Sequence, residues 1–479
     1  MSKKKIVTIF IIGCIFLVSV FSSLLVVAVD SVDPEFCSGN VADWTVMYYM
    51  CGDNHISYEV DTNLADLKKV GSSSKFHLIA LKDQDGFGDS ALYYINKDSV
   101  TDLNWPDEVD MSSPNTLKSF LTFVYNTYPA NNYALFIKSD CGSSWQGCIN
   151  DRQGDTRKTA KLISYPEFAD ILKDVTKNGE DKLDVLIFGP CICQALEAGY
   201  ELSPYVGYMV ASEEHMLEDL DKGHEYVLKY LETTWNLKNN THMTPKEFAL
   251  SLVEFYTPCD FPMFALYLYM VIVKKGNYGT ILQQASDAIT QFMNRRRNPN
   301  YHLIEQHTTL SAIDLCKTSE VVKAIDNLSS LLILHENDED VNSALKYARS
   351  AVREYGKFYV KNRRSFLLKN FYLMLPMEKY AQNSFIDVYH FTDLVCNAVE
   401  NQAITDACFD LMEKVNSSVI ANKVMPGDDS NGFTIYFPDD GRFYNRYLWG
   451  EDPSVKYESL QLSKNSLWNE FLQVYLDIR

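Results

Sequence analysis

The sequence predicts an α/β fold in which helices cover both faces of a mostly parallel sheet. Two observations predict it: short apolar segments alternate with segments of helical spacing through the first half of the chain, and turn-forming clusters separate them. Strands that are continuous apolar runs are typical of parallel sheets buried on both faces. Because ligands of such sheets bind at the carboxyl ends of the strands, functional residues are expected directly after each strand.

Each predicted strand is a short apolar run that a turn or a helix follows. The predicted strands are residues 45–50, 76–81, 92–95, 133–137, 184–188, 208–211 and 432–438. Helices are predicted over residues 58–69, from the capping box Ser164-x-x-Glu167 to about residue 175, around residues 195–200, and over residues 466–476. These elements indicate an α/β portion over residues 42–290 and an α+β portion over residues 300–479.

The N-terminal residues 1–29 predict export. Three lysines precede an uncharged apolar run over residues 6–29, which is typical of a signal peptide or of an uncleaved signal anchor. Either form places the remaining chain outside the cell, secreted or anchored to the outer face of the cell membrane. The membrane is then contacted only through this segment, if it stays uncleaved. Ten cysteines follow it, and thiols tend to pair in an oxidising compartment.

The composition excludes two classes of protein. Apolar residues make up 46% and charged residues 22% of the chain, which is the balance of a globular protein rather than a disordered one. The 44 Lys and Arg against 63 Asp and Glu give a formal net charge of −19. So acidic a chain repels phosphate backbones, and no nucleic-acid partner is expected.

The clearest candidate for chemistry follows the strand predicted over residues 184–188. The chain here is Phe188-Gly189-Pro190-Cys191-Ile192-Cys193. A cysteine between a buried strand and a helix lies on the rim of the sheet, where the helix N-terminus would lower the thiol pKa and favour the nucleophilic thiolate. A purely structural cysteine is the alternative that these residues leave open.

Several further segments occur in a fixed order with this one. They are residues 44–50 with Gly52-Asp53-Asn54, residues 196–197, 200–202, 210–214, 310–315, 385–388, 431–438 and 468–472. In this order the chain from residue 44 to residue 479 resembles the clostripain family of cysteine peptidases, which have a caspase-like fold. The resemblance implies a caspase-like peptidase domain over residues 42–290, with the C-terminal portion of the same fold over residues 300–479, and it makes Cys191 the nucleophile.

The chain departs from the family pattern at two positions. The family's catalytic His stands in an Asn-His-Gly segment before a Trp, whereas the corresponding stretch from Ser139 to Trp145 has Cys141 in that place. The family has Asp-Ala-Cys at the nucleophile, with the Asp associated with basic substrates, whereas Gly189 stands in the place of this Asp. General acid–base assistance is typically worth ~10²–10⁴ in rate, so the resemblance implies an inactive relative.

Three roles remain open for Cys141. It can form a disulfide with Cys191, with Cys148 or Cys193 as other partners in an oxidising compartment. The four cysteines can instead bind zinc, although their spacing is not a usual zinc signature. The third possibility is an unpaired structural cysteine.

Further site residues follow from the strand ends. His215, after the strand predicted over residues 208–211, could act as a relocated base. Gly189, Ser212, Glu213 and Glu214 are expected to form the substrate-binding wall. No metal and no cofactor are expected, unless calcium binds carboxylates among Asp53, Asp151 and Asp155, since calcium prefers oxygen ligands.

We therefore expect an exported clostripain-like peptidase homologue that is proteolytically inactive and acts as a binding or interaction module for a peptide or a protein. The alternative is an active cysteine endopeptidase that uses Cys191 with a relocated base and non-basic specificity. A purely structural role in the cell envelope is a third class.

Overall fold

The computed structural model describes residues 41–54, 56–139, 142–143, 145–151, 161–214, 232, 234–258, 260–262, 305–356, 384–445 and 455–478. Residues Val41–Arg479 form one compact unit. The predicted export segment 1–29 and the predicted site residues Cys141, Asp155 and His215 lie outside the described residues. Among the helices that are described, none is long and apolar enough to cross a membrane.

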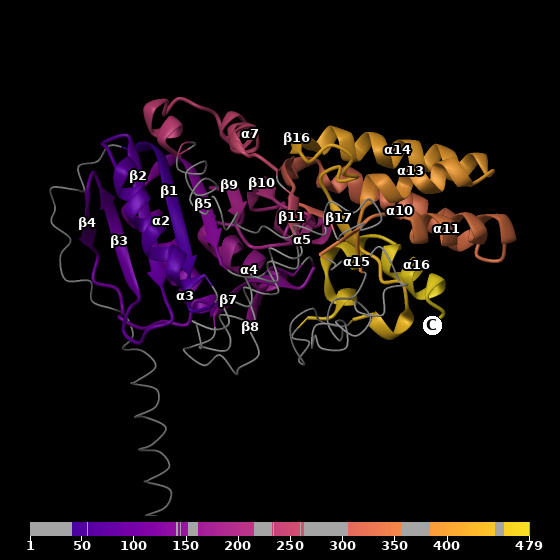
Figure 1. Ribbon diagram of the computed structural model, residues 1–479, viewed down its shortest axis with the longest axis horizontal. Coiled ribbons are helices and arrows are strands. Elements are labelled where there is room, and N and C mark those ends of the chain that lie inside the picture. The colour runs from indigo at the N-terminus through magenta and orange to yellow at the C-terminus, as the bar shows by residue number, and fades with distance from the viewer. Residues whose placement is uncertain are drawn as a thin grey trace, which may run out of the picture. The chain divides into compact units, whose positions relative to one another are not determined.

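A nine-stranded sheet organises this unit, in the order β16-β13-β10-β9-β5-β1-β2-β3-β4 (Figure 1). Neighbouring strands from β10 to β2 are parallel, and the pairings outside them are antiparallel. The strands are β1 (Ala42–Cys51), β2 (Phe76–Asp83), β3 (Ala91–Asn96), β4 (Ser99–Asp102), β5 (Ala130–Lys138), β9 (Leu183–Phe188), β10 (Val206–Ala211), β13 (Leu310–Asp314) and β16 (Val419–Lys423). The predicted, mostly parallel α/β fold is confirmed.

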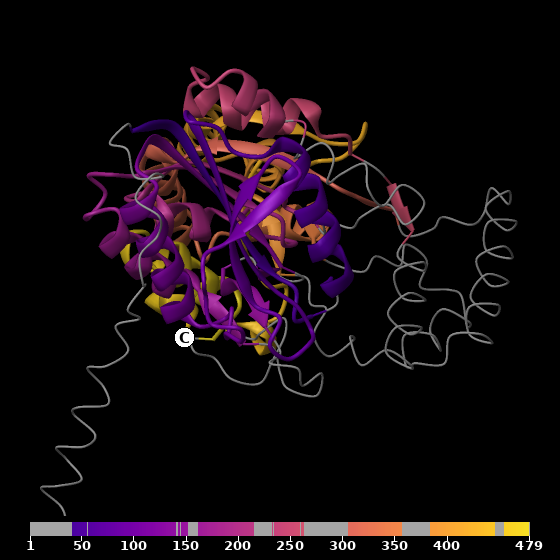
Figure 2. The same ribbon diagram turned by 90° about the vertical axis from the view of Figure 1, so that its left-hand side faces the viewer.

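Helices cover both faces of the sheet because successive side chains of a strand point to opposite faces. Along β1, Met47 and Tyr49 pack with α3, α4 and α5, whereas Val46 and Tyr48 pack with α2 and α7. Figure 2 shows the sheet between α2 and α3. These helices are α2 (Ser57–Val70), α3 (Pro114–Thr127), α4 (Tyr165–Val175), α5 (Leu196–Leu202) and α7 (Pro245–Phe255). Burial on both faces explains why the strands are continuous apolar runs.

The start of α4 shows how local sequence fixes an element. The Ser164 N–H donates to Glu167 Oε2 at 3.0 Å, and the Glu167 N–H donates to Ser164 Oγ at 3.3 Å. Two amide groups that a helix start leaves unpaired are thereby satisfied, and Pro166 in the first turn has no N–H to satisfy. The predicted capping box is confirmed.

The C-terminal portion extends the same sheet and adds a helical layer. β13 pairs with β10, and β16 pairs with β13, so the portions predicted over residues 42–290 and 300–479 share one sheet. Its helices are α10 (Thr318–Leu334), α11 (Glu339–Ala351), α13 (Val388–Ala398), α14 (Gln402–Ser418), α15 (Gln461–Asn465) and α16 (Trp468–Tyr475), with 3-10 turns at Leu315–Lys317, Gly441–Phe443 and Tyr457–Ser459.

Within the described part of the chain, three small sheets accompany the large one. They contain β6 (Gly142–Ser143), β7 (Gly147–Asp151) and β8 (Lys161–Ser164); β11 (Asp260–Pro262) and β12 (Glu305–His307); and β14 (Glu354–Tyr355), β15 (Phe385–Asp387) and β17 (Thr434–Tyr436). β17 lies within the strand predicted over residues 432–438. The Thr434 N–H donates to the Gln194 carbonyl oxygen at 2.9 Å, which joins this C-terminal strand to the loop after Cys191.

Candidate functional site

Cys191 lies in the loop between β9 and α5, at the carboxyl-terminal rim of the central strands, and its side chain is partly exposed. The loop is tied to both neighbouring strands. The Gly189 N–H donates to the Ile137 carbonyl oxygen at 2.8 Å, and the Ile192 N–H donates to the Glu214 carbonyl oxygen at 3.2 Å. Ile192 has a φ of 57°, a strained conformation for a β-branched residue that such tethers can hold. The loop therefore presents Cys191 in a fixed position.

Cys191 is not at the first turn of a helix. Residues 192–195 separate it from α5, which is only seven residues long. The electrostatic effect of a helix N-terminus falls off within the first turn. This geometry therefore does not support the prediction that a helix N-terminus lowers the pKa of the Cys191 thiol.

Two neighbouring thiols are inaccessible. Cys148 on β7 and Cys193 in the Cys191 loop are fully buried, and burial raises the pKa of both thiols. The Cys193 thiol donates to the Cys191 carbonyl oxygen at 3.4 Å. Cys148 and Cys193 are free thiols in this structure. Since Cys141 lies outside the described residues, its disulfide and the zinc alternative stay predictions.

A lysine side chain runs alongside Gly189. A Cβ atom at this position would lie 3.0 Å from the Ile137 carbonyl oxygen and 3.7 Å from Cδ of Lys138. Lys138 Nζ pairs with Glu59 Oε2 on α2 at 2.6 Å, and the two side chains are 22% and 7% exposed. The position to which the resemblance assigns a specificity carboxylate thus has no side chain, and the neighbouring strand supplies a cation beside it.

Ser212, Glu213 and Glu214 follow β10 on the same rim, as predicted, and all three are buried. Their side chains contact other loops of the protein. The contacts are Ser212 Oγ with Thr309 Oγ1 at 3.0 Å, Glu213 Oε1 with the Ser430 hydroxyl at 2.6 Å and the Gly432 N–H at 2.7 Å, and Glu214 Oε1 with the Gly356 N–H at 3.0 Å. They thereby hold C-terminal loops onto the rim, and their role in substrate binding stays a prediction.

Glu213 is paired with a second buried carboxyl group, Asp387, whose Oδ1 accepts the His390 N–H at 2.6 Å. Burial raises the pKa of Asp387 to about 7, and burial together with Asp387 raises the pKa of Glu213. Two adjacent buried carboxyl groups share a proton more readily than both ionise. The pair joins the end of β10 to the start of α13.

Glu197 on α5 is a site-supporting residue to which sequence reasoning assigned no role. Its Oε1 accepts the Tyr436 N–H and the Tyr457 hydroxyl, each at 2.8 Å. Trp145 packs against both tyrosines, with ring centroids 5.4 Å from each. Burial raises the pKa of Glu197 to about 7. This cluster connects the helix after Cys191 to the C-terminal portion. Its one signal in the sequence was that Glu197 and Trp145 fall in segments that resemble the family.

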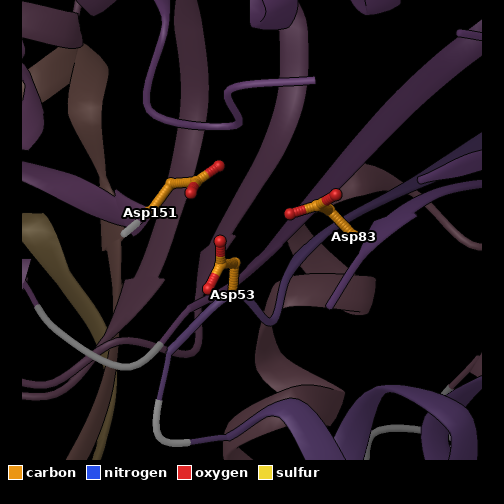
Figure 3. A group of neighbouring side chains, drawn as sticks. All are labelled: Asp53, Asp83 and Asp151. Carbon is orange, nitrogen blue, oxygen red and sulfur yellow. The ribbon is translucent and has the colours of Figure 1, made fainter. Parts of the chain in front are cut away.

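Two predicted calcium-binding residues, Asp53 and Asp151, lie together, and Asp83 joins them (Figure 3). All three carboxylates are buried, and each offers an oxygen within 4.8 Å of the others. Asp83 ends β2, Asp53 follows β1 and Asp151 ends β7. Asp83 was missed because the predicted strand ended at Leu81, two residues before the observed end.

The fold and the position of Cys191 define a class: α/β proteins that present a candidate nucleophilic thiol at the carboxyl end of a central parallel strand. The sequence profile of the clostripain family, peptidase family C11, matches residues 48–475. The chain therefore belongs to the clostripain family of cysteine peptidases, which confirms the resemblance.

Individual proteins are also similar to this chain, in sequence or in fold. Clostripain from Hathewaya histolytica is 21% identical over 444 residues, which cover 84% of this chain and 76% of that protein. An inactive zymogen C11 protease from Parabacteroides distasonis has a similar structure, with a TM-score of 0.52 and 13% identity, over 89% of this chain and 98% of that one. A secreted C11 cysteine protease from Bacteroides thetaiotaomicron also has a TM-score of 0.52, with 11% identity, over 89% of this chain and all (100%) of that one. At such identities the two structures support the fold alone.

Proposed function

We propose that this clostripain-family protein is exported, does not hydrolyse peptide bonds, and binds a peptide or a protein segment at the rim around Cys191. Lost hydrolysis follows from the residue in place of the general base. An unperturbed cysteine thiol titrates near 8.5, and a thiolate in the place of the family's catalytic His would repel a Cys191 thiolate. A second thiol is therefore a poor substitute for imidazole in activating a nucleophile.

Lys138 beside Gly189 is the single structural observation that carries the proposal. A site that accepts basic side chains needs a carboxylate to hold them. Here a Cβ atom at position 189 would lie 3.7 Å from Cδ of Lys138, whose ammonium group pairs with Glu59. Position 189 thus offers no carboxylate to a basic side chain of a ligand, so peptides with neutral or acidic side chains are the expected ligands.

Export is proposed from residues 1–29, in which three lysines precede an uncharged apolar run. One relative of similar structure is described as secreted. Outside the cell the ligand is a peptide or a protein, and the membrane is contacted only through the N-terminal segment if it is retained.

The test is hydrolysis and binding by the full chain with one peptide library. We expect the wild-type chain to show no peptide hydrolysis that depends on Cys191. We also expect it to bind neutral or acidic peptides, and the Cys191→Ala variant to bind them equally well. Cys316→Ala, which changes an exposed cysteine on the 3-10 turn after β13, is the matched control. Turnover by the wild-type chain that Cys191→Ala abolishes and Cys316→Ala preserves would refute the loss of hydrolysis.

That refuting result would favour the alternative, an active cysteine endopeptidase with a relocated base such as His215 and non-basic specificity. The partial exposure of Cys191 and the strained loop that fixes it are the observations in its favour. His215→Ala would then lower the rate of Cys191-dependent hydrolysis, and the bell-shaped pH profile of an acid–base pair would be lost with it.

A further inference from the structure

Two buried carboxyl groups hold the same short segment of the C-terminal portion. Glu213 follows β10 and is 1% exposed, and Asp387 ends β15 and is 0% exposed. Glu213 Oε1 accepts the Ser430 hydroxyl at 2.6 Å and the Gly432 N–H at 2.7 Å. Asp387 Oδ2 accepts the Asn431 N–H at 2.6 Å, and its Oδ1 accepts the Asn431 side-chain amide at 3.1 Å. Three consecutive residues are thus bound alternately by the two carboxyl groups.

The two carboxyl groups also form a hydrogen bond with each other. Carboxylate oxygens are acceptors only, so this bond requires a proton on one of the two groups. Both oxygens of Asp387 already accept N–H groups, among them that of His390 at 2.6 Å, whereas Glu213 Oε2 is buried and accepts no hydrogen bond. Glu213 Oε2 is therefore the atom that carries the proton, and it donates to Asp387.

Other titratable and charged side chains surround the pair. They are Glu214, Arg353, Tyr355, His390, Asp428 and Asp429. Arg353 Nη1 pairs with Asp428 Oδ2 at 2.9 Å, and the Tyr355 hydroxyl donates to Asp428 Oδ1 at 3.0 Å. His390 Nδ1 lies 3.8 Å from Asp429 Oδ2. Since the Arg353 guanidinium is paired with Asp428, a shared proton is the means by which the buried pair avoids carrying two charges.

The segment held by the pair leads into the contact with the Cys191 loop. The Thr434 N–H and hydroxyl donate to the Gln194 carbonyl oxygen at 2.9 Å and 3.1 Å. The Gln194 N–H in turn donates to the Ser212 carbonyl oxygen at 3.0 Å, one residue before Glu213. Release of residues 430–432 would therefore loosen the contacts that hold the loop after Cys191.

We propose that Glu213 and Asp387 form a proton-dependent clamp, in which one proton held between the two carboxyl groups keeps residues 430–432 on the rim that carries Cys191. When this proton is lost to the solvent, two carboxylates face each other in the interior, and their repulsion releases the segment. The rim is held closed at acidic pH and opens as the pH rises. The clamp acts on the rim whether or not the rim binds or hydrolyses peptides.

Opening of the clamp releases a proton. An exposed glutamate titrates near about pH 4.3, whereas burial and the neighbouring Asp387 raise the pKa of Glu213 in the closed state. Opening should therefore become about tenfold more favourable for each pH unit above about pH 5, until the raised pKa is reached.

Native-state hydrogen–deuterium exchange of the full chain measures this opening, once the rates are divided by the intrinsic chemical rate at each pH. The amides of Asn431 and Gly432 should lose protection as the pH rises from about 5, at about tenfold per pH unit. Those of Ile192 and Gln194 should follow them. The amides of α4, which lie outside the clamp, should change less.

Glu213→Gln is the variant that separates the clamp from ordinary packing. Glutamine keeps the acceptor for Ser430 and Gly432 and adds a permanent N–H donor to Asp387, so protection should no longer depend on pH in this window. Asp387→Asn replaces an acceptor oxygen by an amino group that opposes the N–H donors around it, and protection should be lost even at about pH 5. Glu400→Gln, which changes an exposed acid between α13 and α14, is the control and should behave as the wild type.

Two results would overturn the proposal. One is the same pH dependence of protection in the wild type and in Glu213→Gln. The other is a loss of protection in Glu213→Gln at about pH 5, since glutamine would then fail to replace the protonated acid. The comparison of Glu213→Gln with the wild type decides the question even where Asp387→Asn does not fold. None of these readouts depends on hydrolysis or on peptide binding.

Discussion

Replacing Glu197 by Gln should remove a pH-dependent cost from the folded state. Glu197 is 1% exposed, and it accepts two hydrogen bonds, from the Tyr436 N–H and the Tyr457 hydroxyl. Burial raises its pKa from an ordinary 4.5 to about 7, and the hydrogen bonds from Tyr436 and Tyr457 act in the opposite direction. Tyr165 is the other titratable group that interacts with it. Glutamine preserves the acceptor and the size of the side chain but cannot ionise.

The sign follows from comparing the folded and unfolded chains. Below pH 4.5 Glu197 is protonated in both, and no cost arises. Between pH 4.5 and about pH 7 the unfolded chain loses the proton while the folded chain retains it, so stability falls as the pH rises through this window. At about 1.4 kcal/mol for each pH unit, the full cost above pH 7 is about 3 kcal/mol. The free energy of unfolding of Glu197→Gln minus that of the wild type should therefore be about 3 kcal/mol larger above pH 7 than below pH 4.5.

Urea denaturation at a series of pH values, followed by tryptophan fluorescence, measures this difference. A buried amide that lacks a partner can cost about 1–3 kcal/mol, but this cost is the same at every pH and cancels in the comparison. Glu470→Gln, on the exposed side of α16, should show no such change. A stability difference between Glu197→Gln and the wild type that stays constant from pH 4.5 to pH 8.5 would refute the assignment of a raised pKa to Glu197.

Two other predictions concern the rim itself. Lys138→Met leaves the carboxylate of Glu59, which is 7% exposed, without the ammonium group 2.6 Å away, and should lower the free energy of unfolding by about 3 kcal/mol in thermal denaturation. The double variant Lys138→Met with Glu59→Gln should lose much less stability, because no unpaired buried charge remains. Equal losses in the single and the double variant would mean that the two side chains are not coupled. In the native protein iodoacetamide should modify Cys191 before Cys148 and Cys193, because burial blocks access to these two thiols and raises the pKa of both. Mass spectrometry of peptides after timed labelling measures the order, and earlier labelling of either buried thiol would contradict it.

Elements marked by local signals could be predicted from the sequence. The run over residues 184–188 lies within β9, Leu183–Phe188, and the capping box at Ser164 opens α4. β13 and β16 carried no comparable signal. They are short and pair with each other across about a hundred residues of chain, so their position in the sheet depends on long-range contacts that no local pattern records.

The site shows the same division. Cys191, Ser212 and Glu213 were found because each follows a strong apolar strand, and the carboxyl ends of such strands meet at one rim. Burial of Glu213 against Ser430 and its pairing with Asp387 could not be predicted, since residues about two hundred positions apart supply the contacts. A strand-end acid is polar in the sequence and looks solvated until a distant segment covers it.

At position 189 the departure from the family pattern involves more than the loss of one aspartate, because the neighbouring Lys138 also affects which ligands can bind. The substitution Gly189→Asp would place a Cβ 3.0 Å from the Ile137 carbonyl oxygen, which is tighter than most packed contacts, and the backbone of β5 would have to shift. The new carboxylate would then compete with Glu59 for the Lys138 ammonium, since a lysine binds the carboxylates within its reach. A carboxylate paired in this way would have no free charge for a basic ligand. Restoring a pocket for basic side chains therefore requires removing the Lys138 cation as well as adding the acid, and Gly189 and Lys138 act together in setting which ligands the rim accepts.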